Sequence, residues 1–163
     1  MSLLSVQAFF AIHAPDITVM ETEGSSSTVA LAAEAHGVEP DQIAKTICLR
    51  AGETVLLLVT AGTRRLDNRK FRDHFGTKPR MLGGEEVTEI TGHPIGGVCP
   101  FGLSSPLPIY CDLSLQDHGT VLPAAGATNS AVRIAPQRMA ELVSATWVDV
   151  CDMPKPPTDD SGQ

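Results

Sequence analysis

The spacing of apolar positions predicts a helix at the start of the chain and a β-rich centre. Between Leu3 and Ile12 the apolar residues recur at intervals of three and four, which is typical of an amphipathic helix over 2–13 that ends before Pro15. Two runs rich in β-branched and aliphatic residues follow at 46–50 and 54–61, with Gly52 between them. This spacing predicts a hairpin at the centre of a sheet.

Turn and capping residues predict the shorter elements around this hairpin. A helix over 30–35 is expected between capping residues at 25–28 and a stop at Gly37, and a short helix over 41–44 is expected to deliver Lys45 at its exit. Asp67 is expected to cap a helix that ends at Gly76. The other predicted elements are strands at 17–21, 79–82, 108–112, 131–134 and 147–150, and helices at 85–90 and from Pro136.

Residues 92–108 hold four glycines and four prolines in seventeen positions. Glycine permits positive φ and proline fixes φ, so this density predicts a structured but irregular loop. A second loop of small residues is expected at 123–130. Residues 1–152 are expected to form one domain, and the polar, proline-rich segment 153–163 is expected to be a disordered tail.

The composition favours a single soluble domain. The 163 residues are 42% hydrophobic and 19% charged, and the strongest apolar run, at 54–61, is far shorter than the roughly 20 residues of a membrane span. The N-terminal sequence lacks a basic leader, which predicts a cytoplasmic location. Aromatic residues make up 4% of the chain, which argues against binding of single strands by base stacking.

Charge is distributed unevenly along the chain. The formal net charge is −7, but residues 64–80, which we call the basic segment, hold seven basic residues against two acidic ones, for +5, and the remainder carries five against 17, for −12. Such a segment could bind a phosphate backbone, or it could be a solvated helix face. Its basic residues are Arg64, Arg65, Arg69, Lys70, Arg72, Lys78 and Arg80.

Three features could together support acyl chemistry: Lys45, the glycine-rich stretch 96–102 and the small-residue loop 125–130. Backbone amides in such a loop can point at a developing oxyanion, and a lysine can hold a carbonyl oxygen or a phosphate. Cys99 is a weaker candidate as a nucleophile, because His93 is expected to be close to it in sequence only and an apolar wall is the simpler role. The widely spaced cysteines and the missing nucleotide motifs predict neither a metal site nor a cofactor.

The ordered set of short motifs resembles the YbaK/EbsC family over residues 5 to 151. These proteins are free-standing aminoacyl-tRNA deacylases related to the editing domain that is inserted in bacterial prolyl-tRNA synthetases. The motifs are Ile43-Ala44-Lys45-Thr46, Val59-Thr60-Ala61-Gly62, Arg65-Leu66-Asp67-Asn68-Arg69-Lys70, Glu85-Glu86-Val87, Thr91-Gly92 and Gly96-Gly97-Val98-Cys99-Pro100-Phe101-Gly102.

The resemblance implies an α/β (α+β) fold in which a mixed, curled, barrel-like sheet is flanked by helices and the site lies in a crevice beside the lysine. It implies a trans-editing hydrolase that cleaves the ester of a small amino acid mischarged on tRNA-Pro, by attack of water assisted by the substrate's ribose hydroxyl. The implied partners are the acceptor end of tRNA and prolyl-tRNA synthetase, with no role for DNA or a membrane.

The resemblance also implies roles for individual residues. Lys45 would anchor the aminoacyl-adenosine end, Gly97 would present backbone groups to the ester, and the basic segment would face the acceptor stem. Ala131 and Met20 replace an acidic residue and a tyrosine of some relatives, which favours alanine or 2-aminobutyrate over cysteine or serine as the amino acid removed. The residues expected to bind the substrate are Met20, Ile47, Gly96, Val98, Cys99, Pro100, Gly126 and Asn129.

Two other functions remain compatible with the residues. A non-catalytic module that binds tRNA or a synthetase would keep the basic segment and would need no special loop. A small-molecule acyl hydrolase that uses Cys99 would lose all activity in Cys99→Ala.

Overall fold

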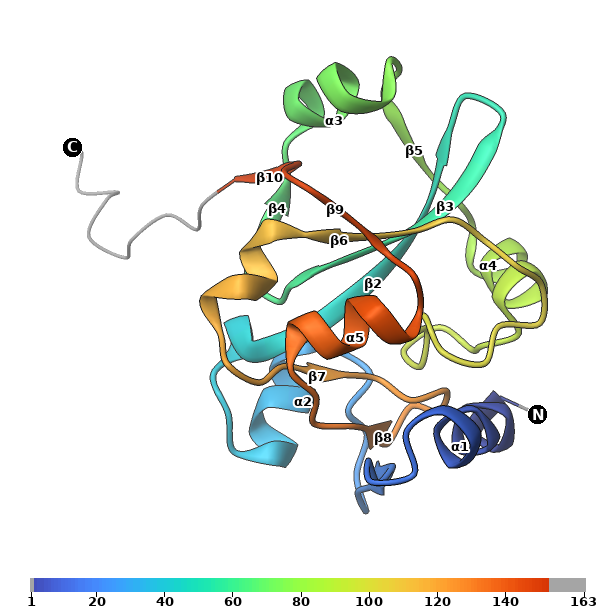
Figure 1. Cartoon of the computed structure of the whole chain (residues 1–163), viewed down its shortest axis with the longest axis vertical. Helices are drawn as coiled ribbons and strands as arrows, with labels where there is room; N and C mark the ends of the chain where they lie inside the picture. The colour runs from blue at the N-terminus through green and yellow to red at the C-terminus, as the bar shows by residue number, and fades with distance from the viewer. Residues whose placement is uncertain (1, 153–163) are drawn as a thin grey trace.

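The chain begins with the helix that the apolar spacing predicts. The computed structural model describes residues 2–152 (Figure 1), and the predicted tail at 153–163 lies outside the described residues. Helix α1 (Ser2–His13) buries Val6 and Phe10. The ring of Phe10 lies 4.6 Å from that of Phe101, measured between centroids, so α1 packs against the glycine- and proline-rich loop.

A mixed, open sheet forms the centre of the molecule, with helices around it (Figure 1). The predicted hairpin is confirmed: β2 and β3 pair antiparallel around a turn at Gly52, where φ is +64°. The strands lie in the order β5-β2-β3-β6-β9, and β7 also pairs with β2, in parallel. The strands of this sheet are β2 (Ile43–Ala51), β3 (Thr54–Ala61), β5 (Pro79–Met81), β6 (Ile109–Asp112), β7 (Leu122–Pro123) and β9 (Thr146–Val148).

Side-chain alternation along β2 and β3 divides the core into two layers. One face carries Cys48 and Val59 into the larger cluster, which includes residues of α1 and of α5 (Pro136–Leu142). The other face carries Leu49 and Leu58 against Phe71 of α3 (Asn68–Phe75). Alternation places Lys45 on this second face.

Helix ends follow the capping signals in the sequence. The Thr28 side chain accepts from the Leu31 N–H at the start of α2 (Val29–His36), and Gly37 ends that helix with φ +67°. Asp67 accepts from the Arg69 and Lys70 amides at the start of α3. The remaining elements are α4 (Gly84–Thr91), the 3-10 helices η1 (Pro40–Gln42) and η2 (Leu113–Asp117), and two small pairs, β1 (Met20–Glu21) with β8 (Ser130–Ala131) and β4 (Arg65–Leu66) with β10 (Cys151–Asp152).

The largest local error of the sequence analysis lies just before Lys45. The predicted helix over 41–44 is a single 3-10 turn, and β2 already begins at Ile43, so Lys45 lies inside a strand and not at a helix exit. The predicted strand at 17–21 is reduced to Met20–Glu21, and that at 131–134 to Ser130–Ala131 with an isolated bridge between Val121 and Ile134. Within residues 2–152, no helix has the length and apolar character needed to cross a bilayer.

Candidate functional site

A pocket lies at an open edge of strand β2. This strand pairs with β7 at Ile43–Ala44 and with β5 at Leu49–Ala51, and among residues 2–152 no strand pairs with the stretch 45–48 on that side. A pocket of about 280 Å³ opens along this stretch. Its walls come from β2, the start of α2, the segment around β5, the loop at 95–98 and β8.

Backbone groups of β2 face this pocket. Ala51 and Thr54 flank a two-residue turn and therefore form a hydrogen-bonded pair. Hydrogen-bonded pairs recur at every second residue of an antiparallel ladder, so the amides of Lys45, Ile47, Leu49 and Ala51 point toward β3. Thr46 and Cys48 therefore direct their N–H and C=O groups toward the open edge. A donor and an acceptor are thus available along the pocket wall without any side chain.

Lys45 lies on the pocket wall, and its ammonium is already bonded to the protein. The Nζ atom donates to the carbonyl oxygen of Arg64 at 2.7 Å. Burial lowers the pKa of Lys45 below its ordinary value, and the positive charge of Arg65 lowers this pKa further, against the opposing effects of Cys151 and Asp41.

The glycine-rich loop reaches the pocket through Gly96 and Val98, whereas Gly97 lies behind them. Gly96 has φ +91°, and a Cβ at this position would stand 2.6 Å from Cβ of Ser27. The Gly97 N–H donates to Pro94 O at 2.9 Å, and its carbonyl accepts from the Gly126 N–H at 3.0 Å. These bonds occupy the backbone groups that the sequence analysis assigned to the ester, so Gly97 holds the two loops together.

The structure brings together only part of the predicted substrate-binding set. Ile47, Gly96 and Val98 line the pocket, as does Ala131. Met20 and Cys99, which were expected to form apolar walls, do not line this pocket. The residues of the predicted set outside the pocket lining are Met20, Cys99, Pro100, Gly126 and Asn129.

Two of these residues have identifiable structural roles. Met20 pairs with Ala131 in the β1–β8 ladder and lines a separate depression that also contains Arg138. The Asn129 side chain donates to Thr22 O at 2.9 Å, which ties the small-residue loop to the segment after β1.

Cys99 and His93 are neighbours in space, contrary to the expectation that they are close in sequence only. The Cys99 Sγ lies 3.6 Å from His93 Nε2. The thiol is fully buried, and burial raises its pKa to about 12, although the Phe101 carbonyl has a smaller opposite effect. His93 also contacts Phe101 O at 2.8 Å and Ser2 Oγ at 2.6 Å. A buried, protonated thiol has no access to a substrate, so the pair supports the loop.

Several pocket residues were missed by the sequence analysis. The segment Ser26–Thr28 was interpreted only as a helix cap, but it also lines the pocket. Met81 and Ile95 stand at the pocket 72% and 58% exposed, an unusual position for large apolar side chains. The run of serines before α2 was a usable signal, whereas the convergence of Met81 and Ile95 depends on tertiary structure.

The basic segment is not uniform in the folded protein. Arg64 is 6% exposed and pairs with Asp41 and Asp117, and Lys70 pairs with Asp149 at 3.1 Å. Arg64 therefore does not face a nucleic acid. The exposed members are Arg65, Arg69, Arg72, Lys78 and Arg80.

In the part of the chain that the structure describes, no group of three or more His, Cys, Asp or Glu side chains could hold a metal ion.

Comparison with known proteins identifies the family. A family model described as "Aminoacyl-tRNA editing domain" matches residues 23–142. The uncharacterized protein YwhH of Bacillus subtilis (strain 168) is 47% identical over 153 residues, which is 93% of this chain and 98% of that protein. A proline–tRNA ligase of Moorella thermoacetica is 34% identical over 79 residues, which cover 48% of this chain and 14% of the ligase.

A solved structure extends the similarity to the whole fold. The crystal structure of a candidate trans-editing enzyme for prolyl tRNA synthetase superposes with a TM-score of 0.86 at 32% identity, over 93% of this chain and 98% of the other. The mixed sheet flanked by helices is shared between the two, which confirms the expected fold, although the sheet is not closed. The chain belongs to the aminoacyl-tRNA editing domain family.

Proposed function

We propose that this protein is a trans-editing deacylase that hydrolyses the ester of a small amino acid mischarged on tRNA-Pro. The observation that carries the proposal is the meeting of Lys45 with Gly96 and Val98 on the wall of one pocket at an open strand edge. Family membership supports the editing role in general. The amino acid, the tRNA and the mechanism are our own inference.

The size and lining of the pocket favour a small aliphatic side chain. Its volume of about 280 Å³ is at the lower end of the range for small-molecule sites. Val29, Ile47 and Ala131 give it apolar walls. Because one methylene is worth only about 1–3 kcal/mol in a binding pocket, a synthetase needs a second site that removes smaller amino acids after charging. These apolar walls suit the methyl and ethyl groups of alanine and 2-aminobutyrate, and we infer that these amino acids are removed in preference to serine or cysteine.

The proposed reaction is hydrolysis by water without an enzyme nucleophile. Water attacks the ester carbonyl and gives up a proton, assisted by the neighbouring ribose hydroxyl, and the carbonyl oxygen becomes an oxyanion. The bond between the acyl carbon and the ribose oxygen then breaks, and that oxygen takes up the proton given up by water, which leaves tRNA with a free hydroxyl. The carboxylic acid formed in this step loses its remaining proton to solvent and becomes a carboxylate. Lys45 anchors the charged end of the substrate, and backbone amides along the edge at Thr46 replace Gly97 as donors near the ester.

Recognition of the tRNA is assigned to the exposed part of the basic segment. Arg80 lies next to Met81, which lines the pocket, so phosphates near the acceptor end would meet a positive surface beside the site. Prolyl-tRNA synthetase is the protein partner that we infer, because it produces the mischarged substrate. Since tRNA is charged in the cytoplasm, the proposed reaction places the protein there.

A deacylation assay on a panel of charged tRNAs tests this function. We expect the wild-type protein to release alanine and 2-aminobutyrate from tRNA-Pro faster than cysteine or serine, and to leave prolyl-tRNA-Pro intact. Lys45→Ala should lower the rate by about a hundredfold or more, the effect typical for loss of a charge-stabilising group. Arg133→Ala, which removes an exposed basic side chain outside both the pocket and the basic segment, is the matched control. A wild-type protein that binds tRNA but releases no amino acid from any member of the panel would instead be the non-catalytic module.

A further inference from the structure

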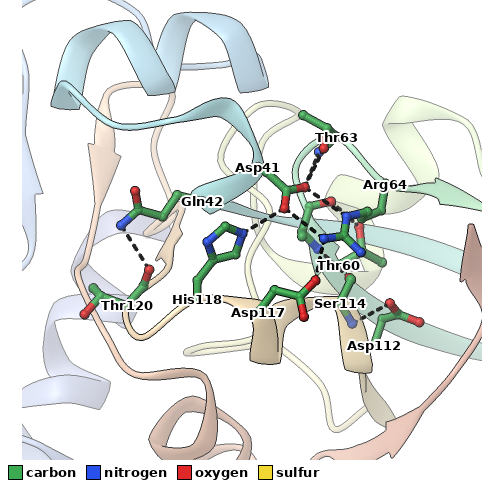
Figure 2. Close-up of polar contacts among 11 residues, drawn as sticks. Asp41, Gln42, Thr60, Thr63, Arg64, Asp112, Ser114, Asp117, His118 and Thr120 are labelled. Atoms are coloured by element: carbon green, nitrogen blue, oxygen red, sulfur yellow. Dashed lines mark hydrogen bonds and ion pairs between the residues drawn. The ribbon is translucent and has the colours of Figure 1, made fainter. Parts of the chain in front are cut away.

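A cluster of charged side chains lies next to the pocket and has no role in the proposed reaction so far. Figure 2 shows Arg64 between two carboxylates, those of Asp41 and Asp117. The Arg64 Nη2 lies 2.6 Å from Asp117 Oδ2, while Nε and Nη2 donate to the two oxygens of Asp41, each at 3.2 Å. His118 Nε2 lies 2.8 Å from Asp41 Oδ2. Although burial raises it, hydrogen bonds from Thr63, His118 and Arg64 lower the pKa of Asp41 to about 2.

Asp41 holds the turn that follows β3. Its Oδ1 accepts from both the backbone N–H and the hydroxyl of Thr63, and its backbone carbonyl accepts from the Gly62 N–H at 3.3 Å. Gly62 is required at this approach, because a Cβ there would lie 2.1 Å from Pro40 O. The 3-10 turn before β2 and the turn at 61–64 are therefore joined at both backbone and side chain.

The same turn supplies the acceptor for the ammonium of Lys45. Arg64 contributes its side chain to the cluster and its carbonyl oxygen to Lys45 Nζ, at 2.7 Å. Lys45 follows η1 by only three residues, so the cluster fixes both the strand that carries the lysine and the carbonyl that accepts its hydrogen bond. Arg64 itself does not line the pocket.

We propose that Arg64, clamped by Asp41 and Asp117, is a positioning residue that fixes the ammonium of Lys45 through the Arg64 carbonyl. The proposal rests on the deacylase function above and assigns a role to residues outside the pocket. A lysine side chain has four rotatable stem bonds, and a free ammonium would sample many positions along the pocket wall. One fixed acceptor orients the remaining two N–H bonds before substrate arrives, which is the condition for efficient use of a charged group.

Nuclear magnetic resonance of the lysine side chains tests the clamp without any substrate. The chain has lysines only at positions 45, 70, 78 and 155, so the Cε–Hε signals of ¹³C-lysine protein are few, and Lys45→Arg identifies the one from Lys45. We expect this signal and its titration midpoint to move in Arg64→Lys. That variant keeps every charge, but a single ammonium cannot reproduce the guanidinium fork between two carboxylates.

Two further variants test the carboxylates that hold Arg64. Asp41→Asn should also move the Lys45 titration, since it loosens the turn and removes one of the ionisable groups that shift the Lys45 pKa, the others being Arg65 and Cys151. Asp117→Asn cuts only the more exposed ion pair and serves if Asp41→Asn does not fold. Asp16→Asn is the matched control, because it breaks the exposed carboxylate pair with Arg138 and should leave Lys45 unchanged.

Kinetic measurements on the same variants distinguish a failure of the positioning role of Arg64 from a failure of the proposed deacylase function. We expect Arg64→Lys to lower kcat of deacylation by about ten- to a hundredfold, the range for a misplaced catalytic group, with little change in KM. An unmoved Lys45 signal in Arg64→Lys, or a moved signal with unchanged kcat, overturns the positioning role. Full activity of Lys45→Ala would overturn the reaction that we propose while leaving the resonance result as it stands, so the two failures are distinguishable.

Discussion

At the scale of single residues, Lys45 combines two properties that oppose each other. Its stem crosses a partly buried strand edge, which disfavours the charged form, and its ammonium has one fixed carbonyl acceptor, which favours it. An unpaired ammonium at this depth would be costly to retain, so the hydrogen bond to Arg64 helps to keep a cation beside the pocket.

The lowered pKa of Lys45 predicts how the proposed activity depends on pH. The ammonium is present below its pKa and is lost as pH rises through it, so deacylation should fall on the alkaline side, at a pH below that of an unburied lysine. The measurement is kcat/KM against pH after subtraction of spontaneous ester hydrolysis. Lys45→Arg is the control, because its guanidinium stays charged and its remaining activity should lack this fall. An identical alkaline limb in both proteins would contradict the assignment.

Residue roles could be predicted from the sequence only where a side chain acts by itself. Lys45 was singled out from the sequence and does line the pocket, although it was expected at a helix exit and lies inside a strand. The sequence analysis assigned the ester contact to Gly97, whereas the residues on either side of it, Gly96 and Val98, line the pocket. Sequence alone does not say which amides of a loop already have hydrogen-bond partners. Cys99 was expected to be a pocket wall, but the burial of a small residue depends on packing from distant parts of the chain.

At the scale of elements, strong periodicity and capping signals were sufficient to predict the elements that they mark. The hairpin of β2 and β3, the helix after Asp67 and the stop at Gly37 lie where local chemistry places them. The short elements were not predictable to the same degree. Pro40 indicates a helix start, but the pairing of Ile43 with Leu122 in β7 extends the strand backward and overrides that signal. The edge strands β5 and β7 in turn leave the gap that becomes the pocket.

The loop that closes this gap depends on a glycine with a positive φ. We expect Gly96→Ala to lower deacylation by at least about tenfold, because it adds strain at φ +91° and forces the loop away from Ser27 on the start of α2. Gly52→Ala is the matched control. It also has a positive φ, but the added Cβ meets nothing within 4 Å, so it should cost less stability than Gly96→Ala and leave the rate unchanged. Urea unfolding and the deacylation rate of both variants are the measurements, and equal rates for the two would contradict the role of the loop.

At the scale of the whole molecule, an acidic protein carries a localised positive surface. Helix α3 places Arg69 and Arg72 one turn apart, and strand β5, which carries Arg80, pairs with β2 beside the pocket. Figure 1 shows α3 and β5 on the same end of the sheet. Repulsion from the remaining acidic surface would orient a polyanion toward this end.

This arrangement predicts which arginines contribute to tRNA affinity. Reversal of charge in the double variant Arg69→Glu, Arg72→Glu should weaken binding to charged and uncharged tRNA-Pro alike, since phosphates carry no information on the amino acid. The slope of log affinity against log salt should fall by about one for each phosphate that the variant no longer neutralises. Fluorescence anisotropy over a salt series measures both. Arg133→Glu makes the same kind of change at an exposed arginine outside the basic segment and should leave the slope unaltered. If the double variant keeps the salt slope of the wild-type protein, the acceptor stem lies on another face. This conclusion holds whether or not the catalytic rate at saturation changes.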